Sequence, residues 1–470
     1  MNKTLLAAAL CTALTSCSMV QEYLRPNAPI PANWPESAKT GGSLRQSSWQ
    51  NYFSDPRLQA LISAALENNR DLRIATARIA EARAQYGLQN ADKLPNLSLT
   101  AAGNDSLTPA GASATGTKMS VQRYDAGLTL VAYELDFWGR VESLNRFAKA
   151  SYLSTEAAQR AFRLSLIADV ANAYLSLLEL QERAQLATDT ARSRGVSRDL
   201  IQRRRELGAS NNLDFLQADG AYQAALAEVA NLQRLQAQAE NLLTLLVGRT
   251  PGELKDLPKG RSLAQQNISS ELLAGLPAEV LLQRPDVISA EQRLIAANAN
   301  IGAARAAFFP RISLTGSIGT ASRTLSGLFD SGSGAWSFQP ALSLPLFDAG
   351  RNQANADIAE ARKVVAVADY EKTIQQAFRE VADLLNARVK IADQLAAQQA
   401  YADTQSQRLK LVQARYTAGI INHLEVLDAE RDTFAAQQNL LQVQRSLLSA
   451  STQLYKALAG RELAEPETGK

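Results

Sequence analysis

The sequence predicts an α+β membrane protein built from very long helices and two β-hairpins. Three observations lead to this fold class. Apolar residues recur at helical spacing over long stretches without proline, two segments alternate between apolar and polar residues, and a short basic and apolar N-terminus precedes the whole. The pattern of helices and strands also occurs twice along the 470 residues, which predicts an internal repeat.

The repeat is clearest at a glycine turn between two long helical patterns. Gly208 and Gly419 are 211 residues apart (419 − 208 = 211), and each is followed by four spacer residues and then by Leu-acid-x-Leu-x-Ala-acid. We therefore expect two helix–turn–helix tips, at about residues 208–212 and 419–422.

The N-terminal pattern is typical of a lipoprotein signal. Lys3 and an apolar run precede Leu14-Thr15-Ser16-Cys17, which resembles the bacterial lipobox, so residues 1–16 are predicted to be cleaved and Cys17 to carry lipid. Ser18 in place of aspartate favours the outer membrane. The alternative is an ordinary signal peptide with a free Cys17. Either way the mature chain keeps at most one cysteine and no intramolecular disulfide.

The rest of the chain divides at changes of pattern. Prolines and a Gly-Gly-Ser run predict an extended tether, and Asp55-Pro56 supplies an N-cap and a first-turn proline for the first helix. The predicted segments are a tether over 17–55, a first repeat over 56–275, a second over 276–460 and a patternless tail over 461–470.

The two alternating segments predict strand hairpins at about 96–135 and 311–346, with residues 103–116 as a long polar loop in the first. A soluble half-buried sheet would alternate in the same way, but the export signal favours a membrane barrel. Four strands cannot close such a barrel, which needs at least about eight. The barrel must therefore be shared between chains, and composition leaves two or three chains open.

Composition excludes several functions. The formal charge of +3 is small and its basic residues are spread, so no nucleic-acid partner is implied. The chain has no G-x-S-x-G, and the Gly111-to-Lys118 stretch lacks the Lys-Ser/Thr order of a phosphate loop. His423 is the one histidine, so no histidine metal cluster exists, and its tip position predicts an exposed side chain. We expect no enzyme activity, catalytic residue, metal or cofactor.

Several motifs resemble the TolC-type outer-membrane efflux channels, and more narrowly their lipoprotein (OprM-like) branch. The resemblance covers nearly the whole mature chain. It rests on the lipobox, Tyr23-x-Arg25-Pro26-x-x-Pro29, Glu134-Leu135-Asp136-x-x-Gly139-Arg140, Arg284-Pro285-Asp286, the run from Ala296 to Pro310, and Leu454-Tyr455-Lys456-Ala457-Leu458.

The resemblance implies a homotrimer in the outer membrane of a Gram-negative bacterium. It would form a twelve-stranded β-barrel in outer-membrane lipid, continued by a twelve-helix periplasmic α-barrel with a mixed equatorial domain. A periplasmic adaptor would link it to an inner-membrane transporter of the proton-driven RND type, and drugs or other solutes would pass passively. An exit duct for type I protein secretion and a structural coiled-coil lipoprotein are the alternatives.

The resemblance also assigns roles at the tips. Leu424, Glu425 and Asp428 would line the periplasmic gate, where three-fold symmetry brings six carboxylates together and favours cations. Tyr416 and Asp214 would be latch residues, although Ile421 replaces the arginine of that latch. Gly208 and Gly419 would turn the tips that meet the adaptor. The alternative for the acids is helix capping, and for Tyr416 packing.

Overall fold

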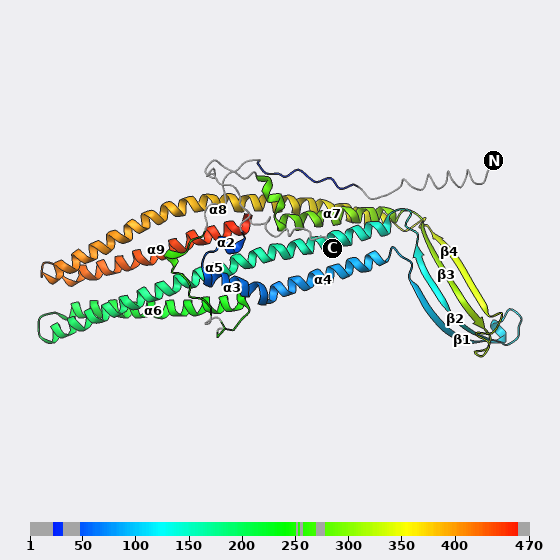
Figure 1. Cartoon of the computed structure of the whole chain (residues 1–470), viewed down its shortest axis with the longest axis horizontal. Helices are drawn as coiled ribbons and strands as arrows, with labels where there is room; N and C mark the ends of the chain where they lie inside the picture. The colour runs from blue at the N-terminus through cyan, green and yellow to red at the C-terminus, as the bar shows by residue number, and fades with distance from the viewer. Residues whose placement is uncertain (1–21, 32–47, 251, 254–256, 269–277, 459–470) are drawn as a thin grey trace. The chain divides into compact units, whose positions relative to one another are not determined.

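The computed structural model describes residues 22–31, 48–250, 252–253, 257–268 and 278–458. The α-helices are α2 (Trp49–Tyr52), α3 (Pro56–Asn68), α4 (Arg70–Ala91), α5 (Arg140–Glu206), α6 (Asn212–Val247), α7 (Pro285–Ala306), α8 (Arg351–Thr417) and α9 (His423–Leu458), and the strands are β1 (Leu97–Thr108), β2 (Met119–Glu134), β3 (Arg311–Ser322) and β4 (Gly334–Ser343) (Figure 1). Three short 3-10 helices, η2 (Ala110–Ala112), η3 (Leu263–Gln265) and η4 (Ala278–Gln283), complete the described elements.

The chain forms two compact units, and α4, α5, α7 and α8 each run from one into the other. The first, here called the sheet unit, comprises the described residues up to Asn27, Arg78–Glu156 and Ser289–Glu371. The second, the tip unit, comprises the described residues of Ala28–Ala77, Ala157–Ile288 and Lys372–Lys470.

The sheet unit holds one antiparallel sheet in the order β1-β2-β3-β4 (Figure 1). The cross-strand register places apolar side chains on one face and small or polar ones on the other, because neighbours in a strand point to opposite faces. The apolar face includes Leu99, Leu128, Ile318, Trp336 and Phe338, and all five are exposed. The opposite face includes Thr100, Asp125, Thr129, Ser317 and Ser337.

The predicted polar loop in the first hairpin was wrong over much of its length. Strand β1 continues to Thr108, and Gly103, Asn104 and Asp105 pair with Tyr124, Arg123 and Gln122 of β2. The two strands pair over twelve residue pairs, so backbone hydrogen bonds satisfy residues whose side chains are typical of loops. The turn between the strands is confined to residues 109–118.

Two glycines allow β2 and β3 to approach closely. Gly127 pairs with Gly319 across these strands. A Cβ atom on Gly127 would lie 2.5 Å from the carbonyl oxygen of Ile318, and one on Gly319 would lie 2.2 Å from that of Ala126. A side chain at either position would therefore collide with backbone that cannot move without breaking the ladder.

The motif Glu134-Leu135-Asp136-x-x-Gly139-Arg140 fixes the junction between β2 and α5. The Glu134 carboxylate accepts hydrogen bonds from Arg140 at 2.7 Å and is 2.6 Å from Arg311 at the start of β3. Asp136 accepts from the N–H of Glu142 in the first turn of α5. Gly139 has a φ of +72°, which favours glycine.

The tip unit has its apolar core where α3, α5 and the end of α6 meet. Leu61 and Ile62 of α3, Ile167 and Tyr174 of α5, and Val247 of α6 are each almost fully buried in it. Asp55 caps α3 as predicted, accepting from the N–H groups of Arg57 and Leu58. Burial opposes its ionisation, yet hydrogen bonds from Gln266, Arg261, Arg57 and Tyr174 hold the pKa of Asp55 below its ordinary value.

The longest elements are α5 and α8, each a single helix of 67 residues. At 1.5 Å per residue such a helix is about 100 Å long, so the prediction of very long helices is confirmed. By length and composition α5 contains a window apolar enough to cross a membrane, but 56% of that window is buried within the fold. Helix α3 ends at Asn68, and α4 begins at Arg70.

Some predictions lie outside the described residues. These are the signal peptide over 1–16, lipidation of Cys17 and the tail over 461–470. The domain boundaries remain predictions, although the second copy of helix, two strands and helix after residue 278 follows the predicted order.

Candidate functional site

The two predicted tips have the same backbone design. At the first, Gly208 has a φ of +72°, its N–H donates to the carbonyl of Arg205, and the N–H of Ala209 donates to Arg204. At the second, Gly419 has a φ of +74°, and the N–H groups of residues 419 and 420 donate to residues 416 and 415. This pair of bonds closes a helix C-terminus through a left-handed residue, which explains why glycine is needed at both turns.

The helix that follows each turn is capped in the same way. The side chain of Asn211 accepts a hydrogen bond from the N–H of Asp214 at 2.9 Å, and that of Asn422 accepts from Glu425 at 3.2 Å. Asp214 and Glu425 therefore occupy equivalent first-turn positions, where the helix dipole favours an acid. This explains their placement without requiring a gate.

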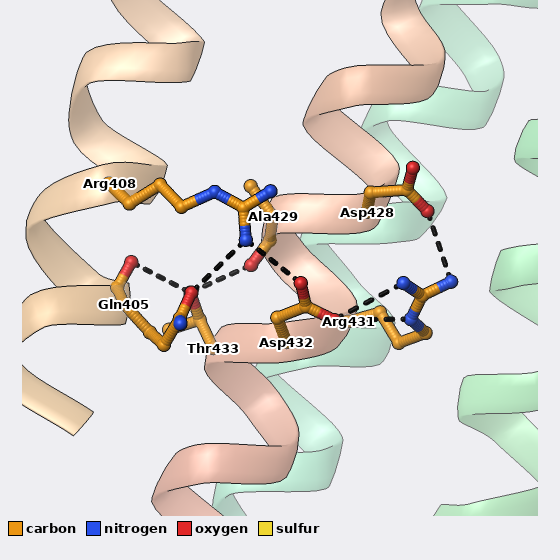
Figure 2. Close-up of polar contacts among 7 residues, drawn as sticks. All are labelled: Gln405, Arg408, Asp428, Ala429, Arg431, Asp432 and Thr433. Atoms are coloured by element: carbon orange, nitrogen blue, oxygen red, sulfur yellow. Dashed lines mark hydrogen bonds and ion pairs between the residues drawn. The ribbon is translucent and has the colours of Figure 1, made fainter. Parts of the chain in front are cut away.

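The gate residues Leu424, Glu425 and Asp428 are on the first turns of α9. Leu424 is 45% exposed, Glu425 is exposed and Asp428 is partly exposed in the single chain. Figure 2 shows that Asp428 is paired with Arg431 of the same helix, at 3.0 Å. The second predicted acid of the gate thus has its own counter-charge.

The same cluster joins α9 to α8. Arg431 also lies 3.2 Å from Asp432, which is 2.8 Å from Arg408 of α8 (Figure 2). The hydrogen bond from Arg408, followed by the contact with Arg431, holds the pKa of Asp432 below its ordinary value. Thr433 donates to carbonyl oxygens of both helices, at Gln405 and Ala429. These contacts tie the two helices of the second tip together.

The two latch residues have separate partners. Tyr416 accepts a hydrogen bond from Arg204 of α5 at 3.0 Å, so this tyrosine links the second tip to the first. Asp214 accepts from the hydroxyl of Ser210 in its own tip at 2.9 Å. Arg205 packs over the ring of Phe215, with 4.2 Å to the ring centroid. Two of the three consecutive arginines at the end of α5, Arg204 and Arg205, therefore contact aromatic side chains near the tips.

His423 is not an exposed polar residue, and that expectation was wrong. Its side chain is 7% exposed, its Nε2 atom lies 2.9 Å from the Ser197 hydroxyl of α5, and its ring is 5.3 Å from that of Tyr416. The helix start turns this residue inward, between the two tips. The sequence held a signal for this, because His423 begins the helix capped by Asn422 and lies three positions before apolar Val426, on the same helix face.

A polar seam joins α5 to α9 farther from the tips. Glu179 is buried between Arg183, at 3.0 Å, and Arg445, at 2.5 Å, and Arg183 also donates to Gln438. Closer to the tips, Arg194 lies 3.9 Å from Glu430, and both are largely buried. Burial raises the pKa of Glu430 and lowers that of Arg194. Loss of one partner from such a buried pair leaves an uncompensated charge, which is strongly destabilising.

Sequence reasoning missed the residues that bridge the helices, namely Arg204, Arg408, Arg431 and Asp432. Only Arg431 carried a local signal, its spacing of three from Asp428 on a helix. The others meet partners more than twenty positions away. No group of three or more acids, histidines or cysteines with metal-binding geometry occurs among the described residues.

Comparison with known proteins gives one consistent relationship. The model of the family described as outer membrane efflux protein matches residues 61–249 and 276–460. The solvent efflux pump outer membrane protein SrpC of Pseudomonas putida is 46% identical, over 95% of this chain and 96% of the relative. The cation efflux system protein CusC of Escherichia coli O157:H7 is 42% identical, over 95% and 96%. The open state of the Neisseria gonorrhoeae MtrE outer membrane channel superposes with a TM-score of 0.84 at 36% identity, covering 94% of this chain and 98% of that one.

Proposed function

Because this chain belongs to the outer membrane efflux protein family, we propose that three copies of it assemble into one continuous duct from the periplasm to the exterior. The protein is a channel rather than an enzyme, it resides in the outer membrane of a Gram-negative bacterium, and it serves as the exit component of a tripartite efflux pump. The partners of the exit duct are a periplasmic adaptor and an inner-membrane RND-type transporter.

The observation that supports a barrel shared between copies is the four-stranded sheet, and membership of the efflux-channel family supports three copies. Its outer strands, β1 and β4, each have one paired neighbour in the order β1-β2-β3-β4. An unpaired strand edge in lipid leaves backbone groups without partners, at several kcal/mol each. Pairing β1 of one copy with β4 of the next removes every such edge, and three copies give a twelve-stranded barrel.

The two faces of the sheet support its placement in a bilayer. The apolar face exposes Leu99 at 81% and Trp336 at 78%, which suits contact with lipid. The polar face, with Asp125 and several hydroxyls, suits a water-filled lumen. In the same trimer, α5, α6, α8 and α9 supply four helices per copy for a twelve-helix barrel in the periplasm, with the shorter helices in an equatorial domain. A lipid on Cys17 adds a second attachment to the membrane.

The second tip is proposed as the periplasmic gate. Leu424, Glu425 and Asp428 line it, and contacts such as Arg204 with Tyr416 hold it against the first tip. In this proposal Asp214 supports the latch only indirectly, through its own turn. The turns at Gly208 and Gly419 present the ends of the hairpins to the adaptor. Transported solutes belong to the classes that such pumps export, drugs among them.

Single-channel recording in planar bilayers tests this function. Purified protein should run as a trimer in native mass spectrometry and form stable, cation-preferring pores. Joint replacement Glu425→Ala with Asp428→Ala should raise conductance and reduce cation preference, because it removes carboxylates from the constriction. Unchanged selectivity would remove these acids from the gate. Trimers that form no pore would leave a structural coiled-coil lipoprotein as the better description.

A further inference from the structure

The single histidine of the chain lies where the two tips meet. His423 is the first residue of α9, and its contacts reach Ser197 on α5 and Tyr416 on α8. Tyr416 in turn accepts from Arg204 of α5. One buried imidazole therefore lies at the centre of the contacts that join the second tip to the first.

The hydrogen bonding of this imidazole suits only its neutral form. Nε2 is bonded to the Ser197 hydroxyl, whereas Nδ1 is buried and has no hydrogen-bond partner among the described residues. A neutral ring that carries its proton on Nε2 donates to Ser197 and leaves Nδ1 as an unused acceptor. Protonation would place an N–H at Nδ1 without an acceptor, in a site shielded from water, which is unfavourable.

The groups around the ring have opposing effects on protonation of the imidazole. Burial disfavours the imidazolium, the carboxylate of Asp214 on α6 favours it, and the guanidinium of Arg204 on α5 disfavours it. Tyr416 on α8 and Ser197 on α5 are neutral neighbours. The next charged pair between α5 and α9 is Arg194 with Glu430, which carries no net charge when both groups are ionised. Together these influences lower the pKa of His423 from its ordinary value.

We propose that His423 is a proton-controlled clasp between the two tips. The neutral ring holds the start of α9 against α5, and the protonated ring leaves this site, so acidification favours separation of the tips. The clasp itself rests on contacts within the tip unit. Only its effect on conductance rests on the proposed gate.

The direction with pH follows from linkage. The packed site binds fewer protons than the released site, so its stability is fully present above the ordinary histidine pKa of about 6.5 and falls as pH drops below it. Between pH 7.5 and 5.5 the ratio of released to packed sites therefore rises by up to about tenfold.

Nuclear magnetic resonance gives a direct test on the natural sequence. The chain contains one histidine, so full-length protein labelled with ¹³C at histidine Cε1, with its purification tag removed, gives one signal, and that signal reports on His423. We expect a midpoint below about 6.5. A midpoint at or above that of a free histidine peptide would overturn the proposal.

Thiol accessibility tests release of the helix. Val426 is 5% exposed one turn after His423, so a Val426→Cys variant should react slowly with a maleimide while the clasp is closed. The same replacement is made in a His423→Asn background, where an amide can still bond Ser197 but cannot titrate. All thiols react more slowly at low pH. The measured quantity is therefore the maleimide reaction rate of Val426→Cys with His423 present, divided by its rate in the His423→Asn background.

We expect this ratio to rise by several-fold, up to about tenfold, from pH 7.5 to 5.5. A constant ratio would show that protonation does not release α9. Bilayer recordings then separate the two proposals. A pH-dependent ratio without a pH-dependent conductance would keep the clasp and refute the gate at the second tip.

Discussion

Arg431 brings one guanidinium within 3.0 Å of Asp428 and 3.2 Å of Asp432, so a single cation serves two acids on consecutive turns of α9. Arg408 of α8 then contacts Asp432 at 2.8 Å, which extends the pairing across the helical hairpin. Asp428 and Asp432 near the second tip are therefore both paired with arginine side chains.

Replacing Arg431 with glutamine should increase the cation preference of the pore. The change leaves Asp428 without a counter-charge, so the permeability ratio of potassium to chloride should rise by about twofold at low salt. The effect should shrink near 1 M salt, where the Debye length is about 3 Å. Arg192→Gln is the matched control, because Arg192 forms an exposed pair of the same spacing with Asp189 on α5. Equal effects of both variants would contradict a specific role for Arg431.

Replacing Gly419 with alanine should destabilise the second tip by about 1–2 kcal/mol, since an L-residue is strained in the left-handed conformation. Nothing lies within 4 Å of the added Cβ, so the penalty comes from the backbone alone. Gly220→Ala is the control: it also has open space, but it lies inside α6 at an ordinary φ, where alanine should stabilise. Limited proteolysis across residues 415–422 measures the difference. Equal susceptibility would show that the turn is not under this constraint.

Replacing Gly127 with alanine should prevent assembly of the barrel. The new Cβ would meet the backbone of Ile318 at 2.5 Å, which forces β2 and β3 apart. Heat-modifiable mobility on denaturing gels should show loss of the folded oligomer. Gly334→Ala at the start of β4 is the control, because a Cβ there meets nothing within 4 Å. A fully folded Gly127→Ala oligomer would contradict the observed register.

Replacing Arg25 with glutamine should release the N-terminal segment. Arg25 forms two hydrogen bonds, of 2.6 and 2.5 Å, with Glu291, and Tyr23 donates to the same carboxylate at 3.2 Å. Loss of the bidentate pair leaves a largely buried acid without its cation. Chymotrypsin should then cleave near Tyr23 several times faster. The exchanged pair Arg25→Glu with Glu291→Arg should recover much of the protection from cleavage. Equal cleavage rates for the natural protein and Arg25→Gln would show that the ion pair does not hold the segment.

Replacing Glu430 alone with leucine should destabilise the contact between α5 and α9 by about 3–5 kcal/mol, because it leaves Arg194 buried without an anion. Replacing both residues, Arg194→Met with Glu430→Leu, should be neutral or stabilising. Burial raises the pKa of Glu430 in the folded protein. The stability that this shift contributes is therefore fully present below the pKa of an unfolded glutamate, and it is lost as the pH rises through the pKa of Glu430 in the folded protein. Urea unfolding at neutral pH measures both variants, and an unstable double variant would contradict this account.

The sequence alone determined the features that depend on local chemistry. Helical spacing without proline predicted the long helices, the 211-residue offset predicted two identical turns, and Asp55-Pro56 predicted the start of α3. Each signal lies within a few residues of the structure that it predicts, so no knowledge of distant partners was required. The same holds for the first-turn acids Asp214 and Glu425.

The tertiary structure decided what depends on residues far apart in the chain. Residues 103–108 form a strand because β2 pairs with them, although their side chains are typical of a loop. His423 is buried because α5 and α8 cover it, and Tyr416 bonds Arg204, 212 positions away. Asp428 in the second tip began as one of two gate acids and is now half of an ion pair with Arg431. Burial and pairing across helices arise from packing, and a repeat in sequence does not encode which faces meet.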